Sequence, residues 1–127
     1  MERPQKVEPL VVLAVDDDAL VLTNTAAMLE DMGHHVLQAP SGREALAILA
    51  EKKVDLVVTD YAMPDMNGVQ LVAALPAGQR VLIVSGFAEI PIDSGSTGPR
   101  LTKPFRDAQL TAAIRQVMQP RGDTVAP

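Results

Sequence analysis

The chain has 127 residues, no cysteine and a formal net charge of −5 at pH 7. That length is typical of one domain with its own core. The lack of cysteine excludes disulfides, thiolate nucleophiles and cysteine-ligated metals. Because the chain is acidic and has only three aromatic residues, Tyr61, Phe87 and Phe105, we expect no direct nucleic-acid partner. No apolar run is long enough for export or membrane insertion, so we expect a cytoplasmic protein.

Short apolar runs rich in β-branched residues predict four strands, at residues 10–15, 35–39, 55–59 and 81–85. Such uninterrupted runs are typical of strands buried on both faces. Helical patterns alternate with them, which predicts an α/β fold with a parallel sheet between two helical layers. We expect a leader at residues 1–9, one folded domain at 10–118 and a flexible tail at 119–127.

The first predicted helix has Asp18 as its N-cap and Gly33 just past its end. Its apolar stripe is predicted at Val21, Thr25, Met28, Leu29 and Met32. Leu22 and Ala26 then lie off that stripe, and we expect them to remain exposed and to dock a partner helix.

Three further helices are predicted from caps and stripes. Ser41 with Glu44 begins the second, Asn67 begins the third, and the last carries Leu110, Ile114 and Val117.

Polar residues follow the apolar runs where ligands bind in a parallel sheet, beyond the carboxyl ends of the strands. They are Asp16, Asp17, Asp60, Ser85 and Lys103. Clustered carboxylates repel one another unless a cation lies between them, and Mg²⁺ prefers such hard oxygen ligands. We expect Asp17 and Asp60 to bind Mg²⁺ directly and Asp16 to bind mainly through water.

A carboxylate held in this way can attack phosphorus and form an aspartyl phosphate. Lys103 would bind one phosphoryl oxygen through its charge, and the Ser85 hydroxyl would bind another.

Four segments together resemble the receiver domains of bacterial response regulators and hybrid histidine kinases. They are LAVDDD at 13–18, VVTDYAMPDMNG at 57–68, VSG at 84–86 and KPF at 103–105. The resemblance extends over residues 10–118. It implies a flavodoxin-like, doubly wound sheet of five parallel strands in the order 2-1-3-4-5.

The resemblance also implies individual roles. Asp60 would accept a phosphoryl group from a histidine kinase or a phosphotransfer protein, with Mg²⁺ as cofactor. Asp16 and Asp17 would be the acidic pair, and the Ala62 carbonyl oxygen a further metal ligand. Ser85 would be the switch hydroxyl and Lys103 the phosphoryl-binding lysine, with a cis peptide bond before Pro104. Phe105 would lie beside the docking face.

Two positions depart from the family pattern. Arg100 stands where receivers usually carry an aromatic ring, and residues 87–99 contain two prolines, two glycines and no helical stripe. We therefore expect a shortened or missing fourth helix.

The function that we expect is phosphorelay signalling by a domain that catalyses its own phosphorylation and dephosphorylation, rather than a turnover enzyme. The sequence leaves open which downstream partner the domain has. It also leaves open whether the domain is a separate regulator or part of a hybrid kinase. One alternative is a haloacid dehalogenase type phosphatase, since Asp16 and Asp18 form a D-x-D pattern, although Leu20 departs from that family. A third alternative, a receiver-like domain that only binds partners, would require the loss of a site residue, and none of the site residues is lost.

Overall fold

The computed structural model describes residues 9–64, 66–86 and 100–119. Five parallel strands form one sheet in the order β2-β1-β3-β4-β5, which confirms the predicted fold class. The strands are β1 (Val11–Val15), β2 (His35–Ala39), β3 (Leu56–Asp60), β4 (Val81–Ser85) and β5 (Arg100–Thr102). The described residues also form α1 (Ala19–Asp31), α2 (Gly42–Glu51), α3 (Gly68–Ala74) and α4 (Asp107–Val117). The expected absence of a full helix at 87–99 lies outside the described residues.

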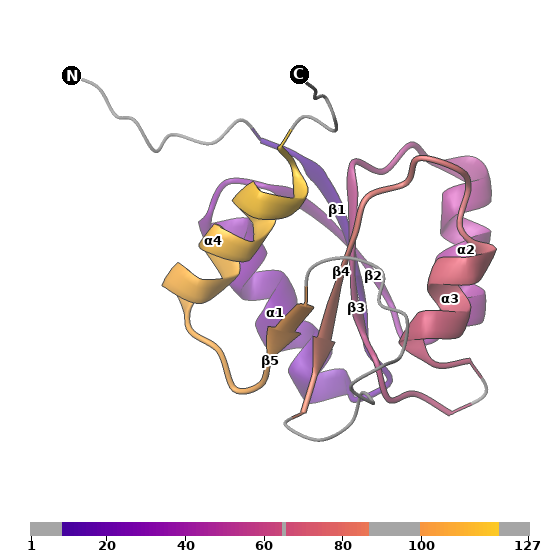
Figure 1. The fold of residues 1–127 in the computed structure, drawn as a ribbon, viewed down its shortest axis with the longest axis horizontal. Helices are drawn as coiled ribbons and strands as arrows, with labels where there is room; N and C mark the ends of the chain where they lie inside the picture. The colour runs from indigo at the N-terminus through magenta and orange to yellow at the C-terminus, as the bar shows by residue number, and fades with distance from the viewer. Residues whose placement is uncertain (1–8, 65, 87–99, 120–127) are drawn as a thin grey trace, which may run out of the picture.

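Two helical layers enclose the sheet: α1 and α4 cover one face, and α2 and α3 cover the other (Figure 1). Alternate residues of β1 divide between two apolar clusters. Val12 and Ala14 belong to the cluster that includes side chains of α1 and α4. Leu13 and Val15 belong to the cluster that includes side chains of α2 and α3. An unbroken apolar run is therefore what this strand needs, because both of its faces are buried.

Capping side chains begin three of the helices as the sequence predicts. Asp18, Ser41 and Asn67 accept hydrogen bonds from backbone N–H groups in the first turns of α1, α2 and α3. Asn67 and Gln70 bond each other's backbone N–H, at 2.8 and 2.9 Å, so the start of α3 is held from both sides. Gly33, with φ of 100°, follows α1 in the left-handed region that favours glycine.

The apolar stripe of α1 differs from the prediction. Leu22, Ala26 and Leu29 are the buried residues of this helix, whereas Val21 and Thr25 are only half-buried. The expectation that Leu22 and Ala26 are free to dock a partner is therefore wrong. Two neighbouring rows of α1 are apolar, and the sheet beneath the helix covers the row that contains the small Ala26.

No helix within the described ranges combines the length and the apolar character needed to cross a membrane.

Candidate functional site

The sheet brings the predicted site residues to its carboxyl edge. Asp16 directly follows β1, Asp60 and Ser85 end β3 and β4, and Lys103 directly follows β5. Backbone hydrogen bonds continue the ladder beyond the strands, from Asp16 N to Ala39 O at 3.2 Å and from Lys103 N to Ser85 O at 2.8 Å. The backbone of the sheet therefore fixes where these side chains begin.

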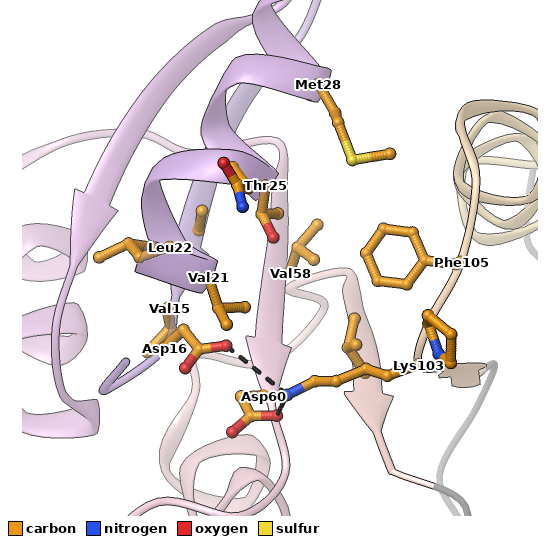
Figure 2. A pocket seen from close by; sticks show the side chains of 14 residues that line it. Val15, Asp16, Val21, Leu22, Thr25, Met28, Val58, Asp60, Lys103 and Phe105 are labelled. Carbon is orange, nitrogen blue, oxygen red and sulfur yellow. Dashed lines mark ion pairs between the residues drawn. The ribbon is translucent and has the colours of Figure 1, made fainter. Parts of the chain in front are cut away.

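Three carboxylates and one ammonium group meet at this edge. Figure 2 shows two of the carboxylates, Asp16 and Asp60, beside the ammonium group of Lys103. Carboxylate oxygens of Asp16, Asp17 and Asp60 lie within 4.8 Å of one another. Lys103 Nζ lies 2.7 Å from Asp60 Oδ1 and 3.9 Å from Asp16 Oδ2. Three negative charges thus face one positive charge, and this excess could hold a metal cation.

Burial determines the electrostatics of the cluster. Asp16 and Asp60 are 7% and 5% exposed, whereas Asp17 is exposed. Burial raises the pKa of Asp16; the Asp18 N–H, which donates to Asp16 Oδ1 at 2.9 Å, and the Lys103 charge both oppose that rise. The neighbouring negative charges of Asp17 and Asp18 add to it. A bound cation would relieve this repulsion, so the residues present fit a hard divalent ion.

The structure also contains the other residues that the sequence singles out. Ser85 is buried at the end of β4, and Ala62 lies on an exposed stretch two residues beyond Asp60. The Lys103–Pro104 peptide bond is cis, as the resemblance implies. The backbone of Arg100 belongs to β5, but its side chain lies outside what the structure describes.

An apolar groove next to the site was not predicted from the sequence. This α1 groove has a volume of about 320 Å³. Val21, Thr25 and Met28 of α1 line one side, and Phe105 faces them from the connection between β5 and α4 (Figure 2). Asp16, Asp60 and Lys103 line the same cavity. Only the packing of α1 shows that its half-buried row borders the carboxylate cluster.

The sequence profile of the response regulator receiver domain matches residues 12–115. The chain belongs to this family. It is a receiver domain of the two-component signalling type, and the dehalogenase alternative is not supported. Curated relatives include the transcriptional regulatory protein GlrR of Escherichia coli, 34% identical over 119 residues in a match that covers 88% of this chain and 27% of GlrR. The sensor kinase CckA of Brucella abortus is 34% identical over 119 residues, covering 85% of this chain and 12% of CckA.

Smaller relatives match along nearly their whole length. The response regulator receiver protein CpdR of Brucella abortus is 28% identical over 114 residues, covering 84% of this receiver domain and 95% of CpdR. The chemotaxis protein CheY4 of Vibrio cholerae has a solved structure that superposes with a TM-score of 0.78 at 29% identity. The match covers 87% of this chain and 100% of that one. The receiver domain thus spans about a quarter of GlrR but most of CpdR and all of CheY4.

Proposed function

We propose that this receiver domain accepts a phosphoryl group on Asp60 from the phosphohistidine of a histidine kinase or a phosphotransfer protein, with Mg²⁺ bound at Asp16, Asp17, Asp60 and the Ala62 carbonyl oxygen. The observation that carries the proposal is the three-carboxylate cluster with Lys103 Nζ 2.7 Å from Asp60. A structural ion pair would need only one carboxylate. The two further carboxylates leave negative charge for a cation to neutralise.

The proposed transfer needs little chemistry from the protein beyond placement and charge. A carboxylate oxygen of Asp60 attacks phosphorus, and the P–N bond breaks with its electron pair on the imidazole nitrogen, which takes up a proton. Lys103 holds one phosphoryl oxygen and Ser85 donates a hydrogen bond to another. Bound Mg²⁺ supplies charge neutralisation and orients the phosphoryl oxygens. Attack by water later releases phosphate and restores the Asp60 carboxylate.

The domain therefore acts as a signalling module that catalyses its own modification. Phosphorylation replaces one carboxylate charge at Asp60 by a group of roughly −2 with strong acceptor oxygens. Lys103 and Ser85 are the groups that respond, and a partner reads the resulting surface. With a net charge of −5, we expect this domain to bind protein rather than nucleic acid directly, in the cytoplasm.

The donor must bring its histidine over Asp60, so its surface must also cover the elements beside that residue. Leu20, the one large hydrophobic residue that is strongly exposed among those described, is 69% exposed near the start of α1. Its chain neighbour Val21, and Asn24 one turn further along α1, line the α1 groove, which extends to Phe105. We place the docking of a partner helix at Leu20 and this groove, in place of Leu22 and Ala26.

The decisive experiment labels the protein with acetyl phosphate and Mg²⁺ and locates the phosphoryl group by mass spectrometry. We expect one acid-labile group on Asp60 and none in Asp60→Asn. Asp55→Asn, an exposed aspartate before β3, is the matched control and should label like the wild type. Labelling of Asp60→Asn at the wild-type rate would overturn the assignment.

The docking surface is tested with Leu20→Glu against a panel of purified, phosphorylated histidine kinases. Transfer from the kinase that labels the wild type fastest should fall about tenfold or more, because a buried charge would replace an apolar contact. Labelling by acetyl phosphate should stay unchanged, since that donor needs no docking. Unchanged transfer from the kinase would contradict this surface.

A further inference from the structure

Two glycines occupy equivalent positions in the fold, each the first residue of a helix and each buried. A Cβ atom on Gly42 of α2 would lie 2.7 Å from Met66 Sδ, at the far part of a flexible side chain that can move aside, and 3.2 Å from Met66 Cβ and Cγ, which need to shift only slightly. A Cβ atom on Gly68 of α3 would lie 2.9 Å from Asp60 O and 3.0 Å from Tyr61 Cα. At Gly68 the obstacle is therefore backbone, and the backbone is that of the proposed phosphoacceptor.

Backbone hydrogen bonds at the start of α3 also close the loop that follows Asp60. The Gly68 N–H donates to Tyr61 O at 2.8 Å, and the Tyr61 N–H donates to Val84 O of β4 at 2.9 Å. The Asn67–Gln70 capping box holds the start of α3 against that point. The backbone at residues 60 and 61 is thus held between β4 on one side and the first turn of α3 on the other.

We propose that Gly68 is a positioning residue for the phosphoacceptor site. Its lack of a side chain lets α3 begin against the Asp60 carbonyl, and this contact sets where the Asp60 carboxylate and the Ala62 carbonyl lie relative to Asp16 and Asp17. The inference rests on the function proposed above. Gly68 does not have the positive φ of Gly33 and Gly78, so its requirement for glycine comes from the close approach and not from its own backbone conformation.

The chain contains a reporter for this contact. Tyr61 is its one tyrosine and it has no tryptophan, so tyrosine emission reports on the residue beside Asp60. A magnesium titration followed by tyrosine fluorescence then measures cation affinity without any phosphoryl transfer. We expect Gly68→Ala to weaken Mg²⁺ binding by about tenfold or more, the range typical when a residue that orients metal ligands is changed.

Two control variants separate positioning from a general loss of stability. Gly42→Ala adds the same methyl group at the same helix position, and Leu71→Val removes a methylene from the buried side of α3. Both should keep the wild-type Mg²⁺ affinity, even where thermal unfolding shows lower stability. An equal loss of affinity in Leu71→Val would overturn the inference, and so would unchanged affinity in Gly68→Ala.

A measurement on the wild type covers the case in which Gly68→Ala does not fold. Hydrogen exchange of the Gly68 amide should slow when Mg²⁺ or beryllofluoride with Mg²⁺ is added, because the site then holds its Tyr61 acceptor in place. Exchange that does not respond would contradict the inference. If the wild type neither binds Mg²⁺ nor accepts phosphate, the proposed function fails; if it does both and Gly68→Ala matches it, only this inference fails.

Discussion

At the amino edge of the sheet, the residue just before each of three strands bonds to the backbone of the same chain. His34 Nδ1 accepts from Leu10 N at 3.1 Å, and Asp55 Oδ2 accepts from Val11 N at 2.8 Å. Arg80, before β4, donates to the carbonyl oxygen of Val117 at the end of α4 at 2.6 Å, and to that of Gln119 just beyond it at 2.8 Å. At the carboxyl edge, three carboxylates instead lie close together, and Lys103 pairs with two of them, Asp16 and Asp60.

The difference separates what stabilises the fold from what does chemistry. Polar groups at the amino edge are satisfied within the chain, so they contribute to stability and have little left to offer a ligand. At the carboxyl edge, burial raises the pKa of Asp16 and negative charge remains in excess, which costs stability but favours a cation and a phosphoryl group. Substitutions at the two edges should therefore affect different measurements.

The largest expected difference comes from removing one cation at each edge. Lys103→Met should slow labelling by acetyl phosphate about 100-fold, because a charge that stabilises the transferring phosphoryl group is lost. Arg80→Met should lower the free energy of unfolding by about 1–3 kcal/mol, because it leaves helix-end carbonyls without their donor. Rates of labelling and denaturant unfolding of both variants test the comparison. A slow-labelling but stable Arg80→Met would contradict it.

Magnesium should stabilise the protein only through the carboxyl edge. Mg²⁺ at about 100 times its dissociation constant should add about 2.7 kcal/mol to the free energy of unfolding. Asp17→Asn should lose most of this gain, whereas Arg80→Met should keep it. Thermal unfolding with Mg²⁺ and with a chelator decides the point. A full gain in Asp17→Asn would place the ion elsewhere.

The smallest expected effect is a pH dependence at the amino edge. Burial lowers the pKa of His34 below its ordinary 6.5, so the unfolded chain takes up a proton first, and stability should fall as pH drops below about 6.5. His34→Asn, which retains an acceptor for the Leu10 N–H, should lose this slope while labelling normally. Urea unfolding between about pH 7 and 5 measures it. A slope that persists in His34→Asn would assign the effect to another group.

Protonation of Asp16, at the carboxyl edge, should change the stability of the fold in the opposite direction to protonation of His34. Its pKa is raised above 3.8, so the folded state binds that proton more tightly. Its own contribution to stability should rise as pH falls from the raised value toward 3.8.

Much of this protein was determined by local sequence. The strands β1 to β4 lie within one residue of the predicted runs, because short apolar stretches rich in Val, Leu and Ile are typical of buried strands, whereas a fifth strand was implied only by the family resemblance. Asp18, Ser41 and Asn67 cap the helices that they were predicted to cap, since a cap acts within one turn. That Asp16, Asp60, Ser85 and Lys103 meet at one edge was also predictable, because parallel strands end at one edge whatever lies between them in the sequence.

Packing between elements decided the rest. Two rows of α1 are apolar, and periodicity could not show that the sheet would bury Leu22 and Ala26 and leave Val21 and Thr25 on the α1 groove. No pattern in the sequence shows that Gly68 approaches the Asp60 carbonyl, because the two residues are eight positions apart in the chain. Both features depend on distances between segments, which helical spacing and residue type do not encode and which only the assembled tertiary structure supplies.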